Sequence, residues 1–243
     1  MRQRVLPFLL CAGALGCAPS ESPRGGEDPG DGQEVHAEAS LASERTGPVV
    51  VFLGTSLTAG LGLARPEDTY VARLAELADS AGLPFQAVNA GVSGDTSAGG
   101  LRRLNWVLRE PLDVLVVELG ANDGLRGQDP DATAENLRAI VDRTRTRYPE
   151  AEVVLAGMEA PPNLGPDYTA RFRSIFPTVA AERGGALVPF LLEGVAGVPA
   201  LNQGDGIHPT AEGHRMMAQT VWPVLEPILR SLAVAQQASE SAP

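Results

Sequence analysis

The sequence predicts a single α/β domain, a three-layer α/β/α sandwich with a parallel sheet in the middle. From Pro48 onward, short apolar β-branched runs alternate with longer segments of helical periodicity. The apolar runs are continuous, which is typical of strands buried on both faces of a sheet. Strands that alternate with helices favour parallel pairing through right-handed crossovers. With 243 residues, the chain has room for one ordinary domain and some additional segments.

The expected elements follow one another in strict alternation. Strands are predicted at 49–53, 85–89, 113–119, 152–158 and 186–188, where β-branched or apolar residues are consecutive. Helices are predicted at 66–81, 101–108, 132–148, 167–183 and 210–232, where apolar residues recur at helical spacing. Together these elements place the folded domain at residues 48–233, and residues 234–243 are expected to form a disordered tail.

The N-terminal segment predicts export. Two arginines precede an apolar run over residues 5–15 that is too short to span a bilayer, so residues 1–17 are interpreted as an export signal. The sequence Ala14-Leu15-Gly16-Cys17 resembles a bacterial lipoprotein box and predicts lipidation at Cys17; simple cleavage after Ala18 is the alternative. Residues 18–47 are rich in Pro, Gly, Ser and acidic residues and are expected to form a flexible tether. We therefore expect a periplasmic or outer-membrane-anchored lipoprotein that contacts the membrane through its lipid.

Composition excludes several kinds of chemistry. The formal net charge is −11, which argues against a nucleic-acid partner. All 19 basic residues are Arg, so a P-loop lysine or a Schiff base is excluded. The only cysteines are Cys11 and Cys17, which leaves the folded part without a thiolate metal site or a cysteine nucleophile. Neither a metal nor a cofactor is expected, and the protein is expected to be a monomer.

Polar residues follow the predicted strands where ligands bind in such sheets, at the carboxyl ends. Ser56 follows the first strand, Gly94 the second and Asn122 the third, while Asp205 and His208 share a loop near the end of the chain. Each has an ordinary structural alternative: a Ser here can cap a helix, a Gly or Asn can form a turn. Together they supply a nucleophile, two donors and an Asp-His pair.

His214 is expected to have a packing or surface role. A zinc site formed by His208 with His214 is disfavoured, because no third ligand follows with suitable spacing. The G-x-S-x-G turn of the α/β-hydrolases is absent, so a nucleophilic Ser56 requires a different turn.

Four sequence blocks resemble those of the SGNH, or GDSL-type, serine hydrolases. They are GTSL at 54–57, VNAGVSGDTSAGGLRRL at 88–104, VLVVELGANDGLRG at 114–127 and DGIHP at 205–209. The second, third and fourth are similar to the bacterial thioesterase I, lysophospholipase and arylesterase branch of that family. The resemblance covers residues 49–229, nearly all of the expected folded part.

The resemblance implies a flavodoxin-like fold with five parallel strands and a specific catalytic centre. It implies Ser56 as the nucleophile, His208 as the general base and Asp205 as the residue that orients His208. The implied oxyanion hole consists of the backbone N–H groups of Ser56 and Gly94 and the side-chain amide of Asn122. One residue departs from the pattern, since the family usually has Asp where this chain has Thr55.

The implied activity is hydrolysis of acyl esters through an acyl-enzyme intermediate. We expect an apolar groove formed by Leu125, Met158, Pro161, Pro162, Leu164, Phe190, Leu191 and Leu192. Such a groove favours small-molecule acyl or lipid substrates such as lysophospholipids and aryl esters over acyl thioesters. Three alternatives remain. They are a carbohydrate acetyl-esterase on the same scaffold, a non-catalytic flavodoxin-like binding lipoprotein, and a structural lipoprotein whose site is inactivated by Thr55.

Overall fold

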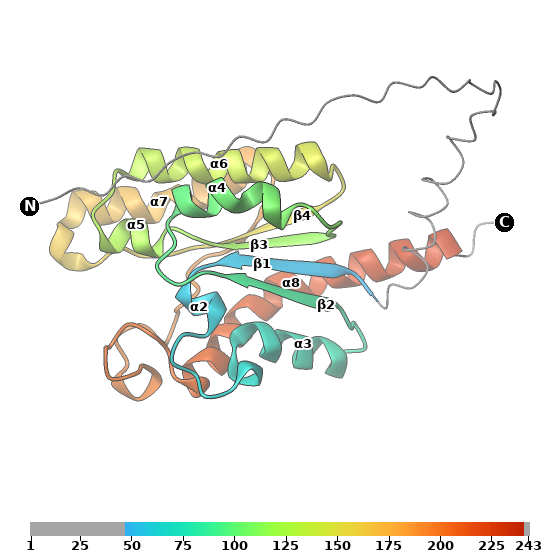
Figure 1. The fold of residues 1–243 in the computed structure, drawn as a ribbon, viewed down its shortest axis with the longest axis horizontal. Coiled ribbons are helices and arrows are strands. Elements are labelled where there is room, and N and C mark those ends of the chain that lie inside the picture. Colours follow the sequence, from blue (N-terminus) through green and yellow to red (C-terminus); the bar gives the residue numbers. More distant parts are fainter. Residues whose placement is uncertain (1–46, 241–243) are drawn as a thin grey trace, which may run out of the picture. The chain divides into compact units, whose positions relative to one another are not determined.

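The structure, a computed structural model, describes residues 47–240, which include a parallel sheet between helices (Figure 1). Its five strands are β1 (Val49–Gly54), β2 (Gln86–Gly91), β3 (Val114–Glu118), β4 (Glu152–Ala156) and β5 (Ala186–Val188). They lie in the order β2-β1-β3-β4-β5, and all four neighbouring pairs are parallel. The predicted five-stranded flavodoxin-like sheet is confirmed. Because the chain changes direction across the sheet at β1 and β3, a crevice is expected at their carboxyl ends.

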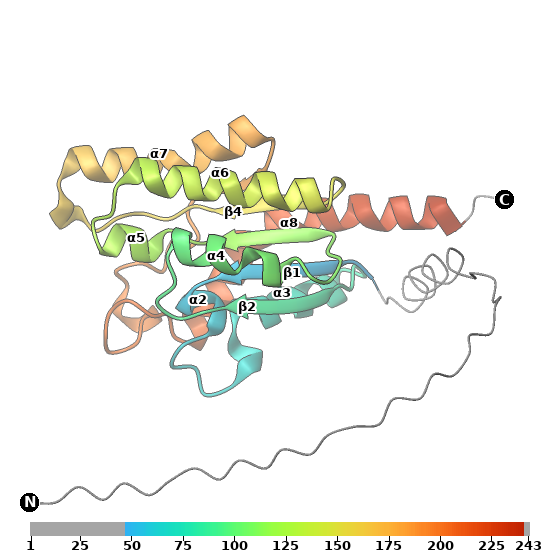
Figure 2. The same cartoon turned by 45° about the horizontal axis from the view of Figure 1, so that its top comes forward.

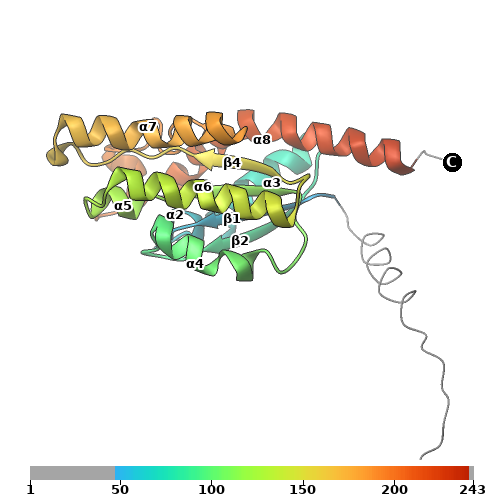
Figure 3. The ribbon, with the colours of Figure 1, turned by 90° about the horizontal axis from the view of Figure 1, so that it is seen from above.

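The long helices cover both faces of this sheet. On one face, α3 (Tyr70–Ser80) packs against α8 (Ala211–Glu240). The other face is covered by α4 (Ser97–Val107), α6 (Pro130–Arg147) and α7 (Pro166–Arg183), as Figure 2 shows. Figure 3 shows α6 and α7 running side by side. The predicted three-layer architecture is therefore confirmed.

Burial of the strands follows from this layering. Every residue of β1 and of β3 is buried, because helices lie on both sides of the central strands. The edge strand β2 exposes its first four residues. The continuous apolar runs in the sequence are thus the central strands, and fully buried strands lead into the crevice at their carboxyl ends.

Several helix boundaries differ from those that the sequence pattern predicts. The helix expected over 66–81 is divided: a 3-10 turn spans Pro66–Asp68, and Thr69 is extended and caps α3 by accepting a hydrogen bond from the Ala72 N–H. The segment 101–108, predicted to be part of a helix, falls in α4, which begins at Ser97 after the N-cap Thr96 and ends at Val107. The two glycines of α4 weaken the helical signal, but packing against the sheet outweighs their low propensity.

The C-terminal helix extends beyond its predicted end at residue 232. Helix α8 reaches Glu240, so the disordered tail expected over 234–243 is wrong for residues 234–240. The segment AVAQQASE contains neither Gly nor Pro and is rich in Ala and Gln, which favour helix. The remaining three residues lie outside the described range.

The export signal at 1–17, the lipidation site Cys17 and the tether at 18–47, except Gly47, lie outside the described residues. Over residues 47–240, no helix combines the length and the apolar character needed to cross a membrane.

Candidate active site

The candidate residues meet at the carboxyl ends of the strands. Ser56 is the first residue of the short helix α2 (Ser56–Ala59), directly after β1, and Asn122 is the second residue of α5 (Ala121–Leu125), after β3. Gly94 lies in the loop after β2, and His208 in the loop before α8. Figure 1 shows α2, α5 and the orange loop that precedes α8 at the same end of the sheet. All four residues line one cavity.

His208 connects a hydroxyl with a carboxylate. Its Nε2 atom lies 2.9 Å from Ser56 Oγ, and its Nδ1 atom lies 2.6 Å from Asp205 Oδ2. This geometry suits a neutral imidazole whose Nδ1–H donates to the carboxylate while Nε2 accepts from the hydroxyl. The arrangement can remove a proton from Ser56 when its oxygen attacks an electrophile.

Asp205 is held in place by its own loop. Its Oδ1 atom accepts hydrogen bonds from the backbone N–H groups of Ile207, at 2.9 Å, and His208, at 3.0 Å. The hydrogen bond from the His208 ring, followed by those from the two backbone N–H groups, lowers the pKa of Asp205 well below its usual range. The carboxylate therefore stays ionised beside the imidazole and favours a positive charge there.

Two candidate oxyanion donors are fixed by hydrogen bonds of their own. Gly94 has a φ of +78°, a conformation that favours glycine, and its carbonyl accepts from Arg126 at 2.9 Å. Asn122 Nδ2 donates to the Asp95 carbonyl at 2.8 Å, which leaves its second amide hydrogen for another acceptor. These bonds restrain the Gly94 backbone and the Asn122 amide in the absence of a ligand.

An ion pair that sequence reasoning missed ties this loop to the nucleophile strand. Arg103 Nε donates to Asp95 Oδ2 at 2.7 Å, and Arg103 also donates to the Gly54 carbonyl at 2.9 Å. Arg103 therefore connects the end of β1 with the loop that holds Gly94. Asp95 and Arg103 both belong to the block at 88–104, but the bond from Arg103 to Gly54 depends on how α4 lies against β1.

Glu118 is a second functional candidate that the sequence analysis did not single out. Its side chain is fully buried at the end of β3 and accepts hydrogen bonds from Thr55 and Thr58, on either side of Ser56 in the chain. Burial raises the pKa of Glu118 to about 7, and the hydrogen bonds from both threonines oppose that rise. A carboxylate within an apolar strand is the sequence signal that points to it.

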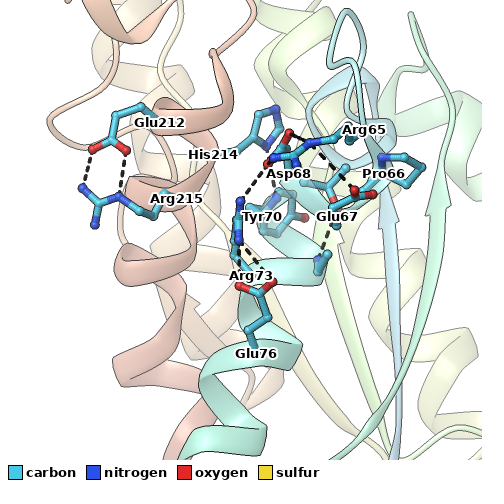
Figure 4. Close-up of polar contacts among 12 residues, drawn as sticks. Arg65, Pro66, Glu67, Asp68, Tyr70, Arg73, Glu76, Glu212, His214 and Arg215 are labelled. Carbon is cyan, nitrogen blue, oxygen red and sulfur yellow. Dashed lines mark hydrogen bonds and ion pairs between the residues drawn. The ribbon is translucent and has the colours of Figure 1, made fainter.

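His214 packs inside the protein rather than on its surface. It is 1% exposed, its Nδ1 accepts from the Tyr70 N–H at 3.2 Å, and its ring stacks on that of Tyr70. Figure 4 shows this pair beside Asp68, which bonds Arg65 and Arg73. Burial lowers the pKa of His214 to about 4, so the ring is neutral at physiological pH. Of the two roles expected for His214, packing or surface, the structure shows packing.

The cavity beside Ser56 has a volume of about 770 Å³ and mostly apolar walls. Six of the eight residues expected to form a groove line it: Leu125, Met158, Pro161, Pro162, Phe190 and Leu192. The expectation is wrong for the other two, because Leu191 is fully buried in the core and Leu164 packs against that core. Position within a loop does not determine which side of it faces the cavity.

Comparison with known proteins finds similar sequences and a similar fold. Residues 52–216 match the model of the GDSL-like Lipase/Acylhydrolase family. The chain is 42% identical over 190 residues to Esterase TesA of Pseudomonas aeruginosa, which covers 78% of this chain and 93% of that one. It is 37% identical over 182 residues to thioesterase 1/protease 1/lysophospholipase L1 of Escherichia coli, covering 74% and 84%. The structure of the esterase EstA from Pseudoalteromonas, inhibited by monoethylphosphonate, superposes with a TM-score of 0.70 at 31% identity, covering 75% and 99%.

Proposed function

This chain belongs to the GDSL-like lipase/acylhydrolase family and hydrolyses acyl esters, and from that premise we propose that Ser56, His208 and Asp205 form its catalytic triad. The observation that carries the proposal is the position of the His208 ring, 2.9 Å from Ser56 Oγ and 2.6 Å from Asp205 Oδ2. The base therefore lies within hydrogen-bond distance of both the nucleophile and the orienting carboxylate.

The geometry supports a two-step reaction. Ser56 Oγ attacks the ester carbonyl while His208 Nε2 takes the hydroxyl proton, and His208 then gives that proton to the leaving alcohol. The tetrahedral oxyanion accepts from the backbone N–H groups of Ser56 and Gly94 and from Asn122 Nδ2. In the second step the same imidazole takes a proton from a water molecule that attacks the acyl-enzyme. The bond from the acyl carbon to Ser56 Oγ then breaks, His208 returns the proton to Ser56 Oγ, and the acid is released. Asp205 remains ionised and stabilises the imidazolium in both steps.

The cavity favours a carboxylic ester with an apolar acyl chain, such as a lysophospholipid or an aryl ester. Its volume of about 770 Å³ suits a small-molecule site, and its rim includes Leu61, Leu125 and Ile207, each nearly half exposed. Phe190 is the only aromatic side chain that lines it among the residues described. A carbohydrate acetyl-esterase would need aromatic platforms for the sugar, so we place that activity second.

We further propose that the protein is exported and anchored through a lipid on Cys17, with residues 18–47 as a tether. The support is the sequence of residues 1–17. Metabolic labelling with radioactive palmitate tests this: label is expected in the wild type and absent from a C17S variant, and equal labelling of both overturns the anchor.

The decisive experiment compares the wild type with S56A on p-nitrophenyl esters from acetate to palmitate. Turnover is expected in the wild type, with an optimum beyond acetate, and is expected to be lost in S56A. S174A, which changes an exposed serine of α7, is the matched control and should resemble the wild type. Unchanged activity of S56A overturns the triad, and an optimum at acetate favours the acetyl-esterase.

A further inference from the structure

A buried carboxylate holds the turn that carries the nucleophile. Glu118 Oε2 accepts from the Thr55 N–H at 2.7 Å, the Thr58 N–H at 3.2 Å and the Thr58 hydroxyl at 2.8 Å. Glu118 Oε1 accepts from the Thr55 hydroxyl at 2.9 Å. The two threonines enclose Ser56 in the chain, so one side chain fixes both ends of the turn.

The backbone beside Glu118 is shaped to admit this carboxylate. Gly54 of β1 lies opposite Glu118 of β3 in the sheet register. A Cβ atom on Gly54 would lie 2.6 Å from Glu118 Oε2 and 2.0 Å from Thr58 Oγ1, closer than atoms can approach. The absence of a side chain at Gly54 therefore leaves the space in which the carboxylate meets the turn.

The arrangement is costly for stability, which points to a role beyond packing. Glu118 is fully buried, and in the part of the chain described no Arg or His is among the groups that stabilise its charge. A buried carboxylate without a cationic partner costs free energy, which an apolar side chain at the end of a strand would avoid. Burial accordingly raises its pKa. The carboxylate instead accepts from four donors of Thr55 and Thr58 and so holds the turn around the nucleophile.

We propose that Glu118 is a positioning residue for Ser56, acting through Thr55 and Thr58. This inference rests on the proposed function, in which Ser56 is the nucleophile. By holding the turn at both ends, Glu118 keeps Ser56 Oγ at 2.9 Å from His208 Nε2. Displacement of a reacting group by about 1 Å can reduce the rate by about a hundredfold, so even a small relaxation of the turn is expected to reduce kcat.

In this chain Thr55 occupies the position that is usually Asp in the family. The Thr55 hydroxyl donates to the carboxylate of Glu118, whereas an ionised Asp at that position can only accept. Two buried carboxylates in contact would have to share a proton.

Three variants test the proposal. E118L removes every acceptor. T58V keeps the shape and the Thr58 N–H but removes the Thr58 hydroxyl, which bonds both Glu118 Oε2 and the Tyr70 hydroxyl. E118Q is the conservative variant: its amide oxygen can replace Oε2, and its amide nitrogen can face the Thr55 hydroxyl, which turns to accept. T144V is the matched control, because Thr144 is equally buried and its hydroxyl donates to the Ile140 carbonyl within α6.

The measurements are kcat, KM and the rate of phosphonylation by a p-nitrophenyl phosphonate, which reports Ser56 attack directly. In E118L, kcat and phosphonylation are expected to fall by about a hundredfold with KM within about threefold of the wild type, and E118Q is expected to recover most of the loss. T58V is expected to lose at least about fivefold in kcat, and T144V to stay within about twofold.

The outcomes separate this proposal from the triad. If S56A reacts with the phosphonate as the wild type does, the triad fails and Glu118 has no nucleophile to position. If only Ser56 is labelled and a folded E118L retains wild-type kcat, the role of Glu118 is overturned while the triad stands. Should E118L not fold by circular dichroism, T58V decides, and wild-type kcat in T58V overturns the proposal.

Discussion

Ser56 Oγ and His208 Nε2 lie 2.9 Å apart although 152 positions in the sequence separate them. Ser56 follows β1, and His208 lies in the loop that leads into α8. The carboxyl ends of the parallel strands all lie at the same edge of the sheet, and the loop before α8 lies at that edge too. The contact therefore depends on the whole sheet, while its chemistry depends on two side chains.

Removal of the Asn122 amide is expected to reduce turnover without weakening substrate binding. N122A should lower kcat by about 10²–10³-fold with little change in KM, because the amide meets the oxyanion only as negative charge develops. Steady-state kinetics on a p-nitrophenyl ester measures this. N105A, which removes an exposed amide on α4, is the control. A kcat of N122A within threefold of the wild type would remove Asn122 from the oxyanion hole.

His214 is expected to make the protein less stable in acid. Its pKa is about 4 in the folded protein and 6.5 as the ordinary value, so the unfolded chain binds the proton first as pH falls. The contribution of His214 to the free energy of unfolding is complete above pH 6.5 and is lost between pH 6.5 and pH 4. It amounts to at most about 3 kcal/mol. Urea unfolding at several pH values measures the slope.

The variant H214Q should lose the part of the pH dependence that comes from His214, while the carboxyl groups titrate equally in both proteins. The difference in unfolding free energy between wild type and H214Q is therefore the quantity to follow from pH 7 to pH 5. A difference that does not change with pH contradicts the assignment of a buried neutral imidazole at His214.

Glu118 is expected to act on stability in the opposite direction. Its folded pKa of about 7 exceeds the ordinary value of 4.5, so its contribution is complete below pH 4.5 and is lost as pH rises through 7. The unfolding free energy of E118Q relative to the wild type should therefore rise by up to about 3 kcal/mol between pH 5 and pH 8.5. E110Q, at an exposed position, is the control and should show no such change. A flat difference for E118Q would mean that Glu118 is already ionised at pH 5.

Sequence alone predicted the features that reside in contiguous residues. The apolar runs that became β1 and β3 are buried throughout, and their alternation with helices implied the parallel sheet. The blocks around Ser56, Gly94, Asn122 and His208 could be found because each is a short string with its own chemistry. A strand that is buried on both faces is apolar along its whole length, regardless of the sequence elsewhere in the chain. Such strands can therefore be recognised from their own residues.

Tertiary structure decided what depends on side chains from distant segments. The division of the first predicted helix at Thr69 and the exclusion of Leu191 from the cavity follow from packing between elements. The bonds of Glu118 to Thr55, and of Arg103 to Gly54, join residues 63 and 49 positions apart. A sequence pattern records which groups are present, but hydrogen bonds act over about 3 Å, and only the folded chain determines which groups come that close.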